Sequence, residues 1–394
     1  MIPQRPGLPI FLMLALIGGS ACRKQATVTQ TSPPGANAPS PDQYHQADGG
    51  ALAIPQTRFF KGSIGSRLGL QMKLTRAGET VTGNYSYQKV GAKIELKGTI
   101  DKDNNLTLEE FDSGGKQTGL FKGIWLIDKD DGLVNVAGNW SKPNSEKKTA
   151  FSLHQEPIEF TGGVELIAKQ SKESNKKLNY KIEAEYPQAT GALDNRFEKF
   201  NQEAKNLVTR RISAFKKETS DVSQDGAATP DASPEDTSAS PANSLDISYS
   251  IALATDDLIS IEFEVGSYAS GAAHPNSYSE VLNYDVKGGK VIKLTDLFNA
   301  GAKSLQLISA YCIKDLKRQA KGKDSMLDDQ TIQSGAGPDA QNYDSWTITK
   351  KGLGITFDAY QVASYAAGPQ SVVVPYSALK ELIKPDGLLA PLAK

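Results

Sequence analysis

Histidine is scarce in this chain of 394 residues, which contains only His45, His154 and His274. A structural zinc site needs a cluster of cysteine or histidine ligands, and a catalytic triad needs a histidine beside a nucleophile and an acid. No motif groups the three histidines in either way. We therefore expect no metal, no cofactor and no catalytic set built on histidine.

A strong net charge and a second long apolar run are also missing. The chain has 44 Lys and Arg against 45 Asp and Glu, which gives a formal net charge of −1. Proteins that bind nucleic acid in general carry a basic excess, so we expect no nucleic-acid partner. A membrane-spanning helix needs about 20 mostly apolar residues, and no segment after Cys22 qualifies.

The first residues instead have the pattern of an export signal. Arg5 precedes a short apolar run at residues 10–17 (IFLMLALI), and Gly19-Ser20-Ala21 lead to Cys22. This run is too short to span a bilayer, and its order is typical of a signal peptide. Gly-Ser-Ala-Cys resembles a bacterial lipobox, with Gly19 in place of the usual leucine. The alternative is an ordinary secretory signal followed by an incidental cysteine.

The lipobox resemblance implies that residues 1–21 are removed and that Cys22 carries lipid. Each buried CH₂ of an acyl chain contributes about 0.8 kcal/mol to membrane binding, so a multiply acylated Cys22 anchors the protein to a membrane without a helix. Arg23 stands where the inner-membrane retention signal of lipoproteins has aspartate. We therefore expect the outer membrane in a cell with two membranes. Cys312 then has no partner for an internal disulfide.

Composition divides the rest of the chain. Residues 22–56 are poor in large apolar residues and predict a disordered tether. Residues 218–244 have no aromatic residue and no periodicity, which predicts a disordered insertion. Residues 322–344 are rich in Gly, Asp and Gln and predict a long surface loop.

Residues 57–157 predict an all-β domain. Short runs such as MKLTRAG and IELKGTID alternate apolar and polar residues and are separated by Gly, Asp or Asn. The spacing indicates an antiparallel meander that closes into a small barrel or sandwich. The aromatic residues Tyr85, Tyr87, Trp125 and Trp140 either fill its core or line a ligand groove.

Residues 158–394 predict an α+β domain, so the fold class of the whole chain is α+β. A strand at residues 178–186 is expected to stop at Pro187. Apolar residues then recur at steps of three and four from Phe197 to Phe215, which predicts an amphipathic helix. Two strands follow at residues 245–253 and 258–265. Cys312 shares one face of a later helix with Leu305, Ile308 and Leu316, and we interpret it as a core thiol.

Three segments of this domain resemble a bacterial extracellular domain of unknown function. They are residues 265–298, which contain Gly-Ala-Ala-His-Pro-Asn, residues 355–379 and the Tyr-Lys-Ile start at residues 180–187. That domain is the lysozyme-binding sensor of an anti-sigma factor and an accessory domain of peptidoglycan deacetylases. The resemblance implies an envelope-binding module with a lysozyme-like protein or peptidoglycan glycan as ligand. We expect neither signalling nor deacetylation, because this chain shows no transmembrane segment, sigma-binding region or deacetylase domain.

The loop after residue 265 contains the candidate binding residues. Its glycines and alanines allow close approach of a partner, and its tyrosine, histidine and asparagine offer an aromatic face and hydrogen-bonding groups. The alternative is a buried turn that the fold needs. The candidate residues, including two from the C-terminal motif, are Tyr268, Ser270, Gly271, His274, Asn276, Tyr360 and Tyr365.

The sequence therefore predicts a lipid-anchored envelope protein that binds without catalysis. A glycan-cleaving hydrolase is the alternative from another class, because Asp and Glu are plentiful even though no motif selects a pair. A structural or stress-related lipoprotein is the third. Carboxylates that converge in a deep cleft would favour the hydrolase, and a shallow aromatic groove would favour binding.

Overall fold

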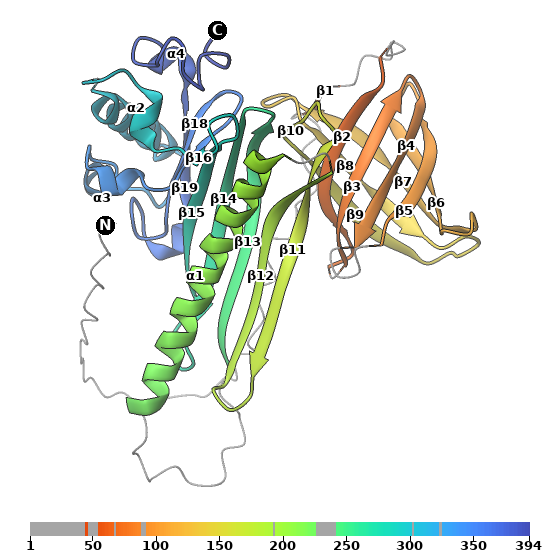
Figure 1. Ribbon diagram of the computed structural model, residues 1–394, viewed down its shortest axis with the longest axis horizontal. Coiled ribbons are helices and arrows are strands. Elements are labelled where there is room, and N and C mark those ends of the chain that lie inside the picture. Colours follow the sequence, from red (N-terminus) through yellow and green to blue (C-terminus); the bar gives the residue numbers. More distant parts are fainter. Residues whose placement is uncertain are drawn as a thin grey trace. The chain divides into compact units, whose positions relative to one another are not determined.

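Two β-rich regions follow each other along the chain in the computed structural model (Figure 1). The structure describes residues 44–45, 54–66, 68–87, 92–191, 194–225, 242–301, 303–322 and 325–394. The predicted signal peptide, Cys22 and most of the predicted tether lie outside these ranges.

The first region is a closed antiparallel barrel of eight strands. Each strand pairs with the next, and β9 returns to pair with β2. A short additional strand, β1 (Tyr44–His45), pairs with β7. The barrel strands are β2 (Gln56–Ile64), β3 (Leu68–Ala77), β4 (Thr80–Tyr87), β5 (Ile94–Ile100), β6 (Asn105–Phe111), β7 (Gln117–Asp128), β8 (Val134–Ser141) and β9 (Lys148–Glu156). The predicted meander and its closure into a barrel are confirmed.

Alternation along each strand fills the barrel. In β3, for example, Leu70, Met72 and Leu74 are buried while the residues between them are not. Successive side chains of a strand point to opposite faces, so one face of each strand forms the core. Tyr85 and Trp125 are 1% exposed and belong to this core.

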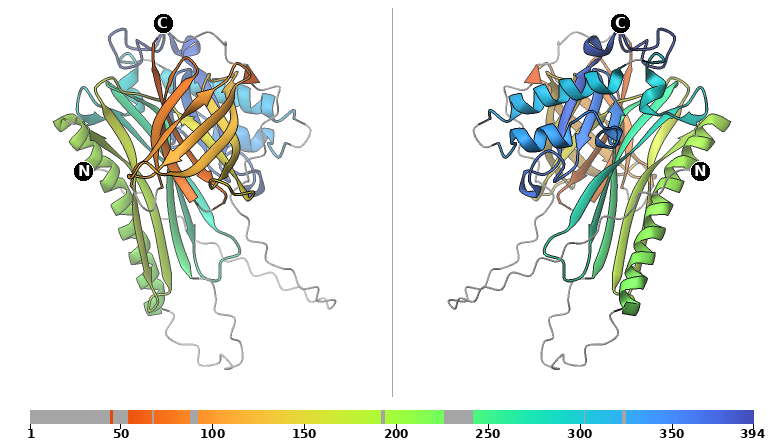
Figure 2. Two further views of the ribbon diagram at one scale, coloured as in Figure 1. Left: turned by 90° about the vertical axis from the view of Figure 1, so that its right-hand side faces the viewer. Right: turned by 90° about the vertical axis from the view of Figure 1, so that its left-hand side faces the viewer.

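The second region is built on a mixed sheet. Its strands follow the order β11-β12-β13-β14-β15-β16, and the short β10 pairs with β13. Helix α1 (Asn195–Asp225) connects the parallel neighbours β12 and β13 and packs on one face of the sheet (Figure 2). The strands are β10 (Ile158–Glu159), β11 (Val164–Asn175), β12 (Tyr180–Gly191), β13 (Asn243–Thr255), β14 (Leu258–Tyr268), β15 (Asn276–Asp285) and β16 (Lys290–Val291).

A smaller sheet, β17-β18-β19, follows and shares a second core with the C-terminal helices. Cys312 is fully buried in this core, and burial raises the pKa of its thiol to about 12. The prediction of a packed core thiol is thus confirmed. These elements are η2 (Leu294–Leu297), α2 (Ser304–Gln319), α3 (Asp329–Gly335), η3 (Ala340–Tyr343), β17 (Trp346–Ile348), β18 (Gly352–Phe357), η4 (Tyr365–Ala367), β19 (Gln370–Pro375) and α4 (Tyr376–Leu379).

The structure corrects the predicted limits of the disordered insertion. Helix α1 continues through residues 218–225, and β13 already begins at Asn243. No glycine or proline interrupts the helix before Gly226. The hydroxyl groups of Thr219 and Ser220 donate to the carbonyl oxygens of Phe215 and Lys216, so they are satisfied within the helix.

Three further expectations are wrong, at least in part. Strand β12 passes through Pro187, which lies opposite Ala168 of β11. The N–H of Ala168 points away from β12 to Gln71, so Pro187 also faces away from β11, beyond the part of β12 that pairs with β13. The loop predicted at residues 322–344 contains the short helix α3, whose Ile332 is buried. Part of the predicted tether, β1 and Gln56, is also strand.

Candidate functional site

Three aromatic rings from two distant segments, two of them exposed and that of Tyr365 half-buried, meet beside β15. We call His274, Tyr360 and Tyr365 the ring cluster. The rings of His274 and Tyr365 stack with centroids 4.1 Å apart and planes 28° apart, and those of Tyr360 and Tyr365 are 5.4 Å and 31° apart. The hydroxyl of Tyr360 lies 3.4 Å from Nε2 of His274. The structure thus brings together three of the predicted site residues.

Hydrogen bonds between the two loops hold the ring cluster in place. The hydroxyl of Tyr365 donates to the carbonyl oxygen of Pro275 at 2.8 Å. The backbone N–H of Ser279 donates to Oδ1 of Asp358 at 2.9 Å. These bonds fix the β14–β15 loop and the first half of β15 against the segment after β18, so the rings form a preorganised surface.

Tyr360 occupies an unusual backbone conformation. Its φ is 71°, and its side chain is 59% exposed. A bulky residue at positive φ costs on the order of 1–3 kcal/mol, and such strain is concentrated at functional sites. The backbone of Tyr360 is strained and its ring is exposed, so the ring adds nothing to the hydrophobic core that would offset the strain. This favours a role in binding.

The other predicted residues form the loop that carries His274. All residues from 269 to 276 are exposed, so this turn is not the buried turn considered as an alternative. Gly271 has a φ of 86°, and Ser270 donates its N–H to Oδ1 of Asn243 at 2.8 Å. Tyr268 ends β14 and Asn276 begins β15. These four residues shape and flank the turn, and the ring stacking itself involves only His274.

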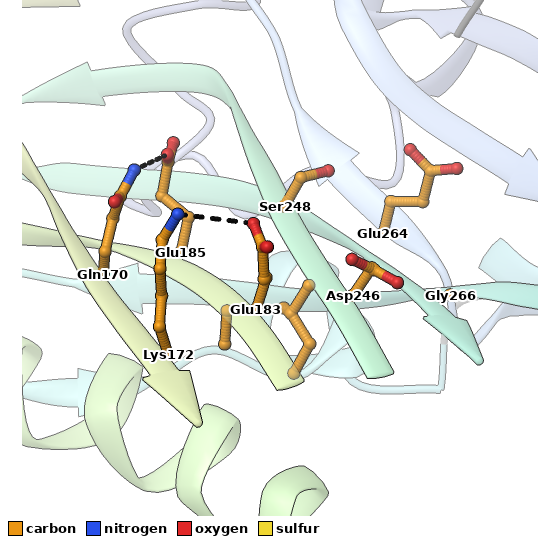
Figure 3. A pocket seen from close by; sticks show the side chains of 10 residues that line it. Gln170, Lys172, Glu183, Glu185, Asp246, Ser248, Glu264 and Gly266 are labelled. Carbon is orange, nitrogen blue, oxygen red and sulfur yellow. Dashed lines mark hydrogen bonds and ion pairs between the residues drawn. The ribbon is translucent and has the colours of Figure 1, made fainter. Parts of the chain in front are cut away.

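Next to the ring cluster, the sheet face opposite α1 is hollowed. Two adjoining hollows of about 470 and 370 Å³ share Ser248 and Glu264. We call them together the acidic groove. Figure 3 shows the larger hollow, in which the side chains of Glu183, Asp246 and Glu264 lie on the same side of the sheet. The smaller hollow adds Glu262.

Strand alternation produces this polar face. In β13, Leu245, Ile247 and Tyr249 are buried, whereas Asp246 and Ser248 between them are exposed. Because one face of the strand packs against α1, the other is left open to solvent. The groove was not predicted from the sequence, although the polar residues at every second position of β12, β13 and β14 were the signal for it.

Charge is distributed unevenly along the acidic groove. At its β11 end, Lys172 lies 3.4 Å from Glu183, and Lys61 lies 2.6 Å from Glu185. Partial desolvation of its carboxyl by the neighbouring strands, together with the charge of Glu183, raises the pKa of Asp246. Within the described ranges, no lysine or arginine forms an ion pair with Asp246, Glu262 or Glu264.

The barrel offers a second group of polar and aromatic residues. Glu110 is 5% exposed and accepts hydrogen bonds from the hydroxyls of Tyr85 and Thr118 and from Nε1 of Trp140, at 2.9, 2.7 and 2.9 Å. A buried carboxylate needs such partners, and this one has three. The group is therefore a structural network inside the barrel, which agrees with core filling as the role of Tyr85.

The part of the chain that the structure describes contains no group of three or more His, Cys, Asp or Glu arranged to hold a metal ion. Among the same residues, no helix is both long and apolar enough to cross a membrane.

Fold and site together describe a closed β-barrel followed by an α+β domain with an exposed ring cluster. Two protein families match the second region. "Deacetylase PdaC" matches residues 173–277, and "Protein of unknown function (DUF3298)" matches residues 295–377. The resemblance of this region to a domain of unknown function that accompanies peptidoglycan deacetylases is thereby confirmed.

Curated relatives match in part. The chain is 25% identical over 254 residues to the peptidoglycan-N-acetylmuramic acid deacetylase PdaC of Bacillus subtilis, a match that covers 64% of this chain and 48% of PdaC. It is 26% identical over 114 residues to the immunogenic protein MPB64 of Mycobacterium bovis, with 29% and 47% covered. The chain thus spans about half the length of the curated relatives it matches.

Solved structures of the DUF3298 family are also similar. One from Bacteroides fragilis aligns with a TM-score of 0.42 and 17% identity over 59% of this chain and 98% of the other. One from Pseudomonas aeruginosa aligns with a TM-score of 0.40 and 19% identity over 56% and 94%.

Proposed function

We propose that this protein is a lipid-anchored component of the bacterial cell envelope that binds peptidoglycan glycan without cleaving it. The exposed ring cluster is the observation that supports this most directly. Aromatic faces provide flat apolar platforms on which sugar rings stack, and adjacent polar groups supply hydrogen bonds. The similarity to a peptidoglycan deacetylase supports the same class of ligand and an envelope location.

Binding is favoured over cleavage by the position of the carboxylates. A glycosidase places two carboxyl groups on either side of the scissile bond within one cleft. Here Asp246, Glu262 and Glu264 all project from one face of a sheet. Asp358, which lines the smaller hollow from the segment after β18, accepts the backbone N–H of Ser279 and so holds the two segments together. An open groove beside stacked rings fits a binding module.

A titration tests the ring cluster. The chain carrying Cys22→Ala, which removes the proposed lipid attachment, is titrated with soluble peptidoglycan fragments and separately with lysozyme. We expect affinity for the fragments on the order of micromolar, weakened tenfold or more by His274→Ala or Tyr365→Ala, which corresponds to about 1.4 kcal/mol. His154→Ala is the matched control, because His154 lies on the barrel strand β9.

The absence of binding to the fragments would overturn the proposed function. Binding that both ring variants leave unchanged, while circular dichroism shows them folded, would remove the ring cluster from the site. Binding to lysozyme alone would replace the glycan by a protein ligand.

Metabolic labelling tests the anchor. Cells that express the intact chain are grown with a labelled fatty acid and then fractionated. We expect the label on the protein and the protein in the membrane fraction, with both lost in Cys22→Ala. A membrane-bound Cys22→Ala protein, or an unlabelled native one, would exclude lipidation of Cys22 as the anchor.

A further inference from the structure

The acidic groove begins where the ring cluster ends. Pro275, which accepts the hydroxyl of Tyr365, is separated by one residue from Ser277, which lines the smaller hollow. On the other loop, Pro369 and Gln370 follow Tyr365 closely and line the same hollow. A chain-like ligand that stacked on the rings would therefore lie close to the smaller hollow.

The groove offers this ligand negative charge and hydroxyl groups. Ser248 lies opposite Glu264, and Ser250 lies opposite Glu262, in the pairing of β13 with β14. Residues two apart on one strand lie about 7 Å from each other on the same face. The groove thus presents carboxylates in a row, interspersed with serines. Lys172, which lines the larger hollow, and Lys181 of β12 both pair with Glu183, and Lys61 pairs with Glu185.

We propose that the acidic groove binds glycan chains that carry free amino groups, with protonated amines paired to Asp246, Glu262 and Glu264 while a sugar ring stacks on the ring cluster. This inference rests on the proposed function, because it assigns the ring cluster to a glycan. It adds which glycan the site selects. A fully N-acetylated chain carries no cation for these carboxylates, and a polyanionic chain is repelled by them.

The physical state of the groove supports a cationic ligand. Partial desolvation and the nearby charge of Glu183 raise the pKa of Asp246, so a cation placed beside this carboxyl would stabilise its charged form. A charge-assisted hydrogen bond between an ammonium group and a carboxylate is about twice as strong as a neutral one. The hollows are recessed in the sheet between the small sheet residues Thr356 and Gln370 and the strand β11. A recess of this size suits an extended chain better than the convex surface of a folded protein.

Two oligosaccharides of equal length, one with free and one with acetylated amino groups, test whether the groove selects amines. The chain carrying Cys22→Ala is titrated with a hexamer of glucosamine and with a hexamer of N-acetylglucosamine, at about pH 6, where amines are protonated and ordinary carboxyls ionised. We expect at least tenfold tighter binding of the glucosamine hexamer, with a preference that declines as salt is added.

Substitutions test which residues cause the preference for the glucosamine hexamer. Asp246→Asn combined with Glu264→Gln is expected to remove the preference for glucosamine by weakening binding of the glucosamine hexamer at least tenfold. Glu109→Gln, an exposed position on barrel strand β6, is the matched control and is expected to leave both affinities unchanged. His274→Ala is expected to weaken both hexamers.

Each outcome decides the question. Equal affinity for both hexamers, or a preference that survives in the double variant, overturns the selection of amines and leaves glycan binding intact. Failure of both hexamers and of the peptidoglycan fragments to bind overturns the proposed function itself. Binding of a basic protein such as lysozyme to the groove, lost in the double variant while neither hexamer binds, assigns the carboxylates to a protein partner and also overturns the inference.

Discussion

At the scale of single residues, substitution of Tyr360 is expected to change the stability of the protein and its affinity for ligand in opposite directions. Its backbone has a φ of 71°, a conformation that asparagine adopts far more readily than tyrosine. We expect Tyr360→Asn to raise the free energy of unfolding by about 1 kcal/mol and to weaken binding of peptidoglycan fragments. Urea unfolding measures the first change and calorimetric titration the second.

Tyr365→Phe is the complementary variant. It keeps the ring that stacks on His274 and removes the hydroxyl that donates to Pro275. Loss of one such hydrogen bond costs about 1 kcal/mol of stability, whereas affinity for a stacked sugar is retained.

If Tyr360→Asn instead lowered stability and left affinity unchanged, Tyr360 would be a structural residue of its turn.

At the scale of secondary-structure elements, glycines allow the barrel strands to approach. A Cβ added to Gly98 of β5 would lie 1.8 Å from the carbonyl oxygen of Thr107 on β6. Because that atom belongs to the backbone, the strand itself would have to move. We expect Gly98→Ala to lower the free energy of unfolding by about 3 kcal/mol. Urea unfolding measures this loss.

Gly162→Ala provides the control for the glycine prediction. A Cβ at Gly162 meets nothing within 4 Å. The same substitution there removes only chain entropy of the unfolded state and is expected to leave stability unchanged or slightly higher. A similar small effect at Gly98 would show that the barrel accommodates the methyl group by shifting β5.

The elements differ in how far the sequence predicts them. Alternation predicts the barrel strands and the helix after Phe197, because each element depends on a local pattern. The end of that helix was missed because composition alone suggested disorder at residues 218–225, which the helix includes. Pro187 misled because its effect depends on which edge of β12 is paired, and pairing is not a local property.

For the candidate site too, the sequence predicts single residues but not how residues from distant segments are arranged. The loop motif identified His274, and the C-terminal motif identified Tyr360 and Tyr365, but only the fold shows that these rings stack. The acidic groove went unnoticed because its carboxylates come from several strands and acquire meaning from a shared face. Contacts between distant segments require the register of the sheet, which composition does not supply.

At the scale of the whole molecule, a buried carboxyl lies where barrel residues contact the second sheet. Glu156 ends β9 and is 8% exposed, and Lys61 of β2 pairs with Glu185 of β12 at 2.6 Å. Gln71 of β3 accepts the backbone N–H of Ala168 on β11. Residues 44–394 accordingly form one compact unit. Burial raises the pKa of Glu156 to about 7, with the charge of Glu185 adding to the effect and that of Lys61 opposing it.

This raised pKa makes the stability of the molecule depend on pH. The folded state holds the Glu156 proton up to about pH 7, whereas the unfolded chain releases it near the ordinary value of 4.5. Between these values the folded state binds more protons than the unfolded one, so stability falls as pH rises through this window.

We expect the Glu156→Gln variant to keep its stability as pH rises through this window, because glutamine cannot ionise. Its stability should resemble that of the native chain at about pH 4.5 and exceed it by about 3 kcal/mol at about pH 8, since each unit of pKa shift corresponds to about 1.4 kcal/mol. Urea unfolding of both chains at the two pH values measures the difference, and Glu109→Gln controls for removal of an exposed carboxylate. If the advantage of Glu156→Gln stays constant between the two pH values, Glu156 is ionised in the folded protein throughout, and Lys61 compensates its charge at this contact more completely than its burial suggests.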